Sequence, residues 1–189
     1  MFGLDDDKLS VRRLSAGETL FRQGDRTTHI FFLLEGRLRL ERQTSEGRHV
    51  VLHTAQAGEF FAEASLFSAH YHCNAVALGS VSVRLYAKKD VLSAIASDPA
   101  NAHDLLACMA LQLQRARLRA EIRAVKAARE RVLIYLESVA DKARRVPVSG
   151  AVQDIAAEIG LTREALYRTL AKLERAKIIE RGKDWIKLL

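Results

Sequence analysis

The segment Val152–Glu174 constrains the fold of this chain more than any other stretch. Its sequence, VQDIAAEIGLTREALYRTLAKLE, repeats apolar residues at helical spacing on both sides of Gly160. Glycine readily takes the positive φ that ends a helix, and Thr162 can cap the helix that follows. The pattern predicts two short helices joined by a tight turn. The residues expected to be buried on the second helix are Leu166, Leu170 and Leu173.

The opposite face of the second predicted helix is polar and charged. It presents Arg163, Glu164, Tyr167, Arg168 and Lys172. Arginines near the N-terminus of an outward-facing helix are typical of the reading helix of a helix-turn-helix. An ordinary helical hairpin with a solvated charged face has the same periodicity. The rest of the chain must distinguish these two interpretations.

Charge is distributed unevenly along the chain. The first hundred residues hold 12 Lys and Arg against 12 Asp and Glu, whereas the remainder holds 18 against 11. The excess of +7 therefore lies entirely in the half that contains the helical pair, which predicts a polyanionic partner. A membrane surface is the weaker alternative, because the sequence shows no long apolar run and no basic amphipathic helix with an aromatic edge.

The first half has the pattern of a small β-structure. Glycines at positions 17, 24, 36, 47 and 58 have the spacing of turns between short antiparallel strands. Polar and apolar residues alternate from Arg37 to Glu41, as they do in a strand with one buried face. We expect a short helix from Asp6 to Leu14, followed by a β-barrel or roll of roughly 80 residues.

A long helix is predicted next. Asp98 is placed to cap it, Pro99 suits its first turn, and no glycine or proline interrupts it before Val125. It carries two apolar stripes. We expect the stripe that includes Leu111 and Ile122 to pack on the chain's own barrel, and the heptad-spaced stripe to meet the same helix of a second copy. A single thick stripe buried inside a monomer is the alternative. The heptad stripe, which Arg123 breaks, contains Leu106, Met109, Leu113, Ala116 and Ala120.

The C-terminal part continues the pattern of a DNA-binding head. An amphipathic helix is predicted from Glu130 to Ala140, before the helical pair. After the pair, Ile178-Ile179 and Trp185-Ile186 flank Gly182 and predict two short strands that form a wing. The predicted order is therefore barrel, long helix and winged helix-turn-helix.

That order, with these residues, resembles the Crp/Fnr family of bacterial transcription regulators. The most specific piece is DIAAEIGLTREALYRTLAKLE, and the barrel stretches GETLFRQGD and AGEFFAEASLF match comparable family stretches. The resemblance implies an α+β fold. It places a double-stranded β-helix (jelly-roll-like) barrel of the cyclic-nucleotide-binding type at 1–98, a dimerisation helix at 99–126 and a winged helix-turn-helix at 127–189.

The resemblance also implies function and partners. It predicts a cytoplasmic homodimer that binds two-fold-symmetric promoter DNA and acts with RNA polymerase. The sequence contains no P-loop, GxSxG, HExxH or paired CxxC pattern, so we expect no enzymatic activity. Two cysteines without a secretory signal are expected to be reduced thiols in the cytosol.

The family's base-reading pattern, Arg-Glu-x-x-x-Arg, falls on Arg163, Glu164 and Arg168. Arginine can donate two hydrogen bonds to guanine O6 and N7, and glutamate can accept one from cytosine N4. The resemblance implies half-sites of the TGTGA kind about one helical turn apart. The residues expected to contact phosphates, which position the protein without specifying sequence, are Thr162, Tyr167, Thr169 and Lys172.

The barrel departs from the family's cyclic-AMP pocket. Glu63 matches the acidic residue of that pocket, although a turn residue bonded to backbone is an alternative role. The family's phosphate-binding Arg-Ser pair falls on Cys73 and Asn74, and its adenine-contacting Thr-Ser pair falls near Ala116 and Arg117. Neutral side chains cannot neutralise a phosphate as arginine does, although Arg117 offers a charge from the helix. We therefore expect an unknown small-molecule effector and no binding of cyclic AMP in the usual way.

A metal or haem site is a weaker hypothesis for the barrel. His70, His72 and Cys73 are the candidates, because some relatives sense gases through haem held by histidine and cysteine. On a strand the two histidines would share a face and Cys73 would point away. A cysteine that faces a barrel is usually a small core residue. The alternative function is therefore a haem- or ligand-sensing module whose basic half does not read DNA specifically.

Overall fold

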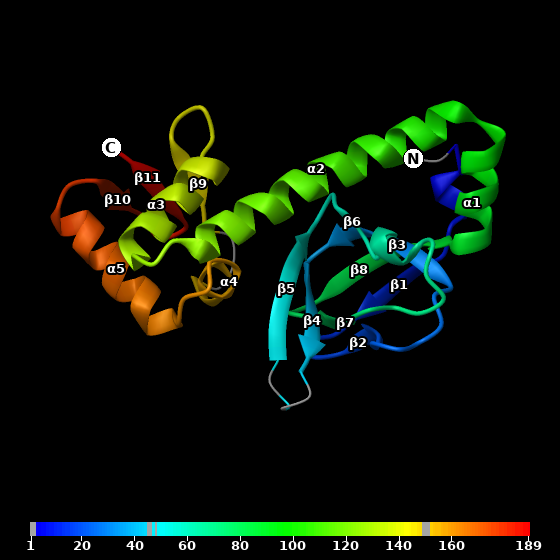
Figure 1. Ribbon diagram of the computed structural model, residues 1–189, viewed down its shortest axis with the longest axis horizontal. Coiled ribbons are helices and arrows are strands. Elements are labelled where there is room, and N and C mark those ends of the chain that lie inside the picture. Colours follow the sequence, from blue (N-terminus) through cyan, green and yellow to red (C-terminus); the bar gives the residue numbers. More distant parts are fainter. Residues whose placement is uncertain (1–2, 45–46, 48, 149–151) are drawn as a thin grey trace. The chain divides into compact units, whose positions relative to one another are not determined.

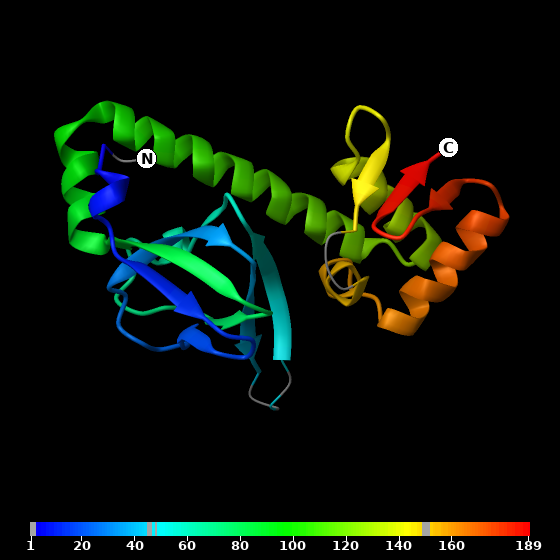
Figure 2. The ribbon, with the colours of Figure 1, turned by 180° about the vertical axis from the view of Figure 1, so that it is seen from behind.

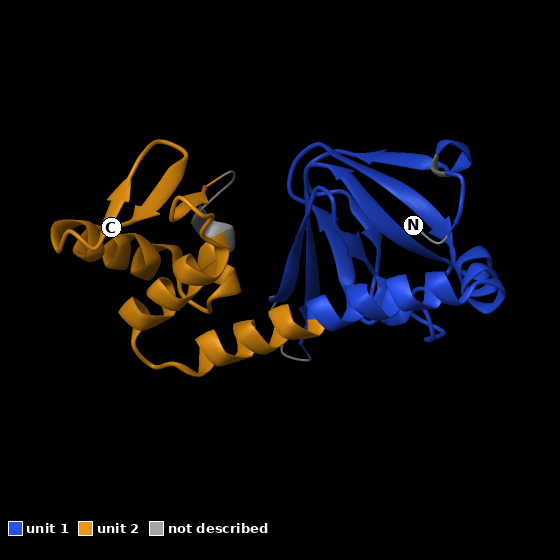
Figure 3. Cartoon of the chain, turned by 90° about the horizontal axis from the view of Figure 1, so that it is seen from above, with its two compact units in different colours: residues 1–112 blue, residues 113–189 orange. Residues whose placement is uncertain are grey.

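The computed structural model of the protein describes residues 3–44, 47, 49–148 and 152–189 (Figure 1). The chain divides into two compact units, residues 1–112 and 113–189, which are described one at a time (Figure 3). The long helix α2 (Pro99–Ala124) begins in the first unit and ends in the second.

The first unit is built from two four-stranded antiparallel sheets, as far as its described residues go. One sheet has the order β1-β8-β3-β6 and the other β2-β7-β4-β5. Seen from behind, β1 lies alongside β8 (Figure 2). This arrangement confirms the predicted jelly-roll-like fold class, although the two sheets do not join into a closed barrel. The strands are β1 (Val11–Leu14), β2 (Thr19–Phe21), β3 (His29–Glu35), β4 (Arg37–Gln43), β5 (His49–Gln56), β6 (Phe60–Phe61), β7 (Asn74–Ala77) and β8 (Val81–Ala87).

Side chains from both sheets form one core. Alternate residues of the strands point inward, so Leu33 from one sheet and Leu38 from the other are both fully buried. The turn between β3 and β4 requires Gly36, whose φ is +83°. A Cβ at this position would lie 2.2 Å from the carbonyl oxygen of Ser80, so a larger residue would force the backbone at Ser80 or at the turn to shift.

The second unit packs helices against a small sheet. Three antiparallel strands have the order β10-β11-β9 within the described part of this unit. Leu166, Leu170 and Leu173 are buried in its core, which confirms the prediction from their spacing. The elements are α3 (Ala128–Val139), β9 (Arg145–Pro147), α4 (Val152–Glu158), α5 (Arg163–Arg175), β10 (Ile179–Arg181) and β11 (Trp185–Leu188).

The prediction of a short helix from Asp6 to Leu14 was wrong. A 3-10 turn covers only Asp6–Lys8 (η1), and Val11–Leu14 is strand β1, paired with β8. A short isolated helix is marginal, whereas pairing along β8 satisfies the backbone of this segment. The sequence reasoning also missed helix α1 (Lys88–Ser97) and strand β9. Pro147 ends β9 at the edge of its sheet, where a missing backbone donor is tolerated.

The predictions for α2 were correct at its start and partly wrong for its stripes. The Asp98 carboxylate accepts the N–H of Ala100 at 2.9 Å, which confirms the cap. Ile122 does not pack on the β-roll; it is buried in the core of the second unit, and Leu111 is half exposed. Leu105 packs against the β-roll instead. Leu105 lies in the part of α2 that belongs to the first unit and Ile122 in the part that belongs to the second, so each packs into the core of its own unit.

Candidate nucleic-acid interface

The turn between α4 and α5 sets the start of the predicted reading helix. Gly160 has a φ of +69°, and the N–H of Leu161 bonds to the carbonyl of Ala156 at 2.8 Å. With the bond from Gly160 N–H to Ala157, this is a Schellman ending for α4. Thr162 then caps α5, because its hydroxyl accepts the N–H of Ala165 at 3.1 Å. Both local predictions for this turn are confirmed.

The proposed base-reading residues lie on the exposed side of α5. Arg163, Glu164 and Arg168 are all exposed. At about 100° per residue they span an arc of about 140° around the helix axis, and none of the three buried leucines falls within this arc. Tyr167 is exposed within the same arc. The helix therefore presents two arginines and a carboxylate together on its solvent side.

Contacts among these side chains hold their charges in place. The guanidinium of Arg163 lies over the ring of Tyr167, 5.5 Å from its centroid. Hydrogen bonds from the backbone of Glu164 itself and from the Thr162 hydroxyl, together with the nearby charge of Arg163, lower the pKa of Glu164. Its side chain is therefore a carboxylate at neutral pH, which can accept hydrogen bonds but not donate them.

Thr169 does not fit its predicted role as a phosphate contact. It is only 8% exposed, and its hydroxyl donates to the carbonyl of Ala165 at 2.7 Å. Thr169 lies next to the buried leucine stripe of α5, so its hydroxyl is used within the helix. The Thr169 hydroxyl is therefore not available to a phosphate, whereas Thr162, Tyr167 and Lys172 are exposed.

The wing beside α5 is fixed by polar and aromatic contacts. Nε of Arg181 donates to the Glu174 carboxylate at 2.9 Å, and this pairing lowers the pKa of Glu174. Trp185 lies under the guanidinium of Arg145, 5.0 Å from the ring centroid. A Cβ at Gly182 would lie 2.3 Å from the Trp185 ring, so glycine lets the wing close over it. Between the wing and α5 is a hollow of about 320 Å³ whose lining includes Tyr167, Arg181 and Lys183.

In the β-roll, Glu63 is a buried residue. It lies in a 3-10 turn (η2, Glu63–Ser65) that follows Ala62, a non-glycine residue with a φ of +64°. Burial raises the pKa of Glu63, and hydrogen bonds from its own backbone and from the Gln112 side chain oppose that rise. Its Oε2 atom has no hydrogen-bond partner among the described residues. Gln112, from α2, was not among the predicted site residues.

Cys73 and Asn74 bring no positive charge to the predicted effector pocket. Burial raises the pKa of the Cys73 thiol to about 11; nearby Arg42 opposes this rise and Glu63 adds to it. The Asn74 side-chain oxygen accepts the N–H of Gln23 at 2.8 Å. Arg42, which the sequence reasoning missed, donates through Nε to the His72 carbonyl at 3.1 Å. This bond to the residue before Cys73 identifies Arg42, and no local sequence motif indicates it.

The weak metal candidates are dispersed. Nε2 of His72 lies 3.2 Å from the Ser65 hydroxyl, and His70 is exposed at a bridge to Arg26. Across the described residues there is no group of three or more His, Cys, Asp or Glu side chains able to hold a metal ion. None of the helices in the described part is long and apolar enough to cross a membrane.

The heptad stripe of α2 is exposed to solvent. Leu106 is 66% exposed and Leu113 is 52% exposed, and Met109, Ala116 and Ala120 are exposed as well. Leucines exposed at regular spacing on one helix are typical of a surface that a partner covers. Arg117 is also exposed, on the part of α2 that belongs to the second unit. The placing of Ala116 and Arg117 in an effector pocket stays a prediction.

Comparisons with known proteins agree with this geometry. Residues 11–98 match the cyclic nucleotide-binding domain, and residues 130–189 match the Crp-like helix-turn-helix domain. The nitrogen fixation regulation protein FixK of Bradyrhizobium diazoefficiens is 30% identical over 168 residues, which cover 85% of this chain and 70% of FixK. The cyclic AMP receptor protein of Thermus thermophilus is 28% identical over 88% of this chain and 77% of its own length.

The fold is also shared with a solved structure. FixK2 from Bradyrhizobium japonicum superposes with a TM-score of 0.80 at 24% identity, over 95% of this chain and 92% of FixK2. Fold and site together define a helix-turn-helix protein with an attached β-roll of the nucleotide-binding type. The chain belongs to the Crp/Fnr family of transcription regulators, as its sequence predicted.

Proposed function

We propose that this chain is a homodimeric regulator that binds a two-fold-symmetric DNA site and responds to a small molecule at its β-roll. The observation that carries the proposal is the exposed face of α5. A capped helix, buried only on its leucine side, presents Arg163, Glu164 and Arg168 together, and the Glu164 carboxylate is ionised. The regulatory role in the name of FixK supports the same class, and the name of the cyclic AMP receptor protein supports a response to a small molecule.

In the DNA complex we assign different roles to the residues of α5. Arg163 and Arg168 donate to guanine, and Glu164 accepts from cytosine. Thr162, Tyr167 and Lys172 contact phosphates and set the position of the helix. When Arg163 enters the major groove, it either loses its contact with the Tyr167 ring or moves together with that ring. The wing is a further place for phosphate contacts, because Lys183 is exposed beside the hollow next to α5.

The dimer forms through the exposed heptad stripe of α2. A two-fold axis there places one reading helix from each copy on successive turns of the same DNA face. In this scheme residues 1–98 sense the effector, 99–126 join the two copies and 127–189 bind DNA. The proposal includes RNA polymerase as a partner and no enzymatic activity.

The effector is an unidentified small molecule. It is not cyclic AMP held in the way that is usual for the family. Cys73 is a neutral thiol and Asn74 is bonded to backbone, so neither compensates a cyclic phosphate. Glu63 has a buried oxygen that no described residue pairs with, which suits a ligand that donates a hydrogen bond. Arg42 and Arg117 are the charges to test if an anionic ligand is found.

The test of the proposed function uses the full chain and a randomised duplex library. We expect repeated selection to yield one sequence with inverted half-sites, bound by a dimer. Binding to that duplex should survive excess random competitor, and all binding should weaken steeply with salt. Selection that enriches no sequence, or equal affinity for selected and random duplexes, would overturn specific reading and favour a sensing module with a nonspecific basic half.

A further inference from the structure

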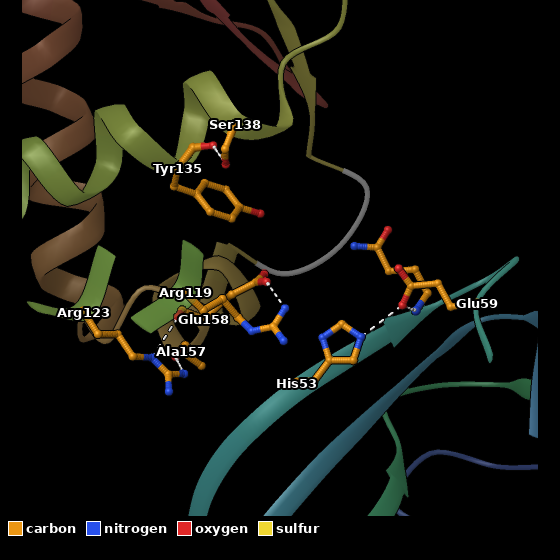
Figure 4. Close-up of polar contacts among 9 residues, drawn as sticks. His53, Glu59, Arg119, Arg123, Tyr135, Ser138, Ala157 and Glu158 are labelled. Atoms are coloured by element: carbon orange, nitrogen blue, oxygen red, sulfur yellow. Dashed lines mark hydrogen bonds and ion pairs between the residues drawn. The ribbon is translucent and has the colours of Figure 1, made fainter. Parts of the chain in front are cut away.

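Arg123 interrupts the heptad stripe of α2 at a position where the pattern calls for an apolar residue. Its side chain is directed at the DNA-binding head. Nε of Arg123 donates to the carbonyl of Glu158 at 3.1 Å, and Nη2 donates to the carbonyl of Ala157 at 3.3 Å (Figure 4). Both acceptors belong to the last turn of α4. The last turn of α2 is therefore bonded to the first helix of the helix-turn-helix pair.

The C-terminal end of α4 is a favourable place for this guanidinium. The Schellman ending supplies backbone donors to the carbonyls of Ala156 and Ala157, and Arg123 supplies one to Glu158. The helix dipole makes this end negative, so a cation stabilises it and its hydrogen bonds are charge-assisted. Arg119, one turn earlier on α2, lies 3.9 Å from the Glu158 carboxylate.

The same contacts reach the turn that precedes the reading helix. Arg131, from α3, donates through Nη1 to the carbonyl of Gly160 at 3.0 Å, and its Nε donates to the Val125 carbonyl between α2 and α3. A Cβ added at Gly160 would lie 3.4 Å from Cγ of Arg123, so the stem of Arg123 lies close to the turn. Only Leu161 separates Gly160 from Thr162, the cap of α5. A shift of the end of α2 must therefore displace the start of α5.

We propose that Arg123 is a positioning residue for DNA reading: it fixes the α4–α5 turn to the end of α2, so that the position of α2 sets the position of Arg163 and Glu164. The inference rests on the proposed function, in which α5 reads bases. It gives the break in the heptad stripe a role, because an apolar residue at this position would extend the stripe and release α4. Arg123 contacts no DNA in this scheme and acts through the backbone of α4.

The test compares Arg123→Ala with Arg129→Ala. Arg129 is an exposed arginine on the neighbouring helix α3, so its loss removes the same charge without removing the clamp on α4. Affinities are measured by fluorescence anisotropy on the selected duplex and a scrambled duplex, at concentrations where every variant is dimeric. We expect Arg123→Ala to bind the selected duplex about tenfold more weakly than Arg129→Ala does, and both to bind the scrambled duplex equally.

Two further measurements separate positioning from folding. Trp185 is the only tryptophan of the chain and lies in the wing, so its fluorescence reports whether the head is folded. Arg123→Lys keeps the charge but cannot donate from two nitrogens of a planar fork, so its ratio of selected to scrambled affinity should fall between wild type and Arg123→Ala. If Arg123→Ala does not fold, a wild-type ratio in folded Arg123→Lys overturns the proposal, and a reduced ratio supports it.

The outcome also separates this inference from the proposed function. A wild-type protein that selects no sequence overturns base reading itself. A wild-type protein that selects a sequence, with Arg123→Ala and Arg129→Ala equal on that sequence, overturns only the role of Arg123.

Discussion

Leu113 and Leu111 provide a matched test of the dimer surface. They are leucines of the same helix with similar exposure, 52% and 48%. Two residues along a helix correspond to about 200°, so the two side chains point to nearly opposite sides. Only Leu113 belongs to the heptad stripe. We expect Leu113→Ala to weaken the dimer and Leu111→Ala to leave it unchanged.

The expected size of the effect follows from the exposed area. Full burial of a leucine side chain contributes about 1.5–3 kcal/mol. About half of Leu113 remains to be buried and alanine keeps part of the contact, so truncation should remove about 1 kcal/mol per copy. A two-fold interface contains the substitution twice, which gives about 2 kcal/mol and a dissociation constant raised about 30-fold. Alanine is as good a helix former as leucine, so the folded monomer should not be weakened.

The measurement is the dimer dissociation constant from sedimentation equilibrium over a series of concentrations. Circular dichroism of each variant checks that the helix content is unchanged. Equal weakening by both substitutions, or no weakening by either, would refute the assignment of the heptad stripe as the dimer surface. A stronger effect of Leu111→Ala would place the interface on the other side of α2.

Three further predictions concern the turn, the predicted effector pocket and the partly buried Cys73 thiol. Gly160→Ala should destabilise the second unit by about 1–2 kcal/mol in urea unfolding followed by Trp185, because a methyl group is disfavoured at its φ of +69°; an unchanged midpoint would contradict this. Calorimetric titration with cyclic AMP and cyclic GMP should show no micromolar binding, and micromolar affinity for either would show that the pocket compensates a cyclic phosphate without the family's Arg-Ser pair. In a Cys108→Ser variant, iodoacetamide should alkylate Cys73 at pH 8 about a hundredfold more slowly than it alkylates an exposed peptide thiol. The reason is that a pKa of about 11 leaves little of the reactive thiolate. Equal rates for Cys73 and the peptide thiol would contradict the raised pKa of Cys73.

The sequence was most informative where structure is decided locally. The helical pair follows from residues a few positions apart: leucines at spacings of three and four, a threonine before the helix and a glycine after the preceding one. Asp98 and Pro99 likewise mark the start of α2 within a few residues. Caps and amphipathic spacing act within one or two turns, so they can be read without knowing the rest of the fold.

Features that depend on distant partners were not predictable in the same way. The segment from Val11 to Leu14 became a strand because β8 was available to pair with it. Thr169 lies at the margin between the exposed and buried sides of α5, and periodicity does not decide which side such a residue joins. Arg123 read as a defect in an apolar stripe, because its partners lie more than 30 residues later in the chain.

The effector pocket shows a second limit of sequence reasoning. Cys73 and Asn74 stand where the family's Arg-Ser pair is expected, and neither carries a positive charge: burial raises the pKa of the Cys73 thiol, and the Asn74 oxygen accepts the N–H of Gln23. The residues that could replace the missing charge or contact Glu63, namely Arg42 and Gln112, come from another strand and from α2. If this region binds an effector, contacts between elements would set its chemistry more than any local motif.

Affinities of Arg168→Ala and Lys172→Ala for a selected and a random duplex test the central claim, that α5 reads base edges, most directly. We predict that Arg168→Ala loses about 1–3 kcal/mol on the selected duplex and almost nothing on the random one. Lys172→Ala should lose affinity equally on both and reduce the salt slope by about 1. Equal losses of Arg168→Ala on the two duplexes would show that α5 contacts phosphates only, and would contradict the account.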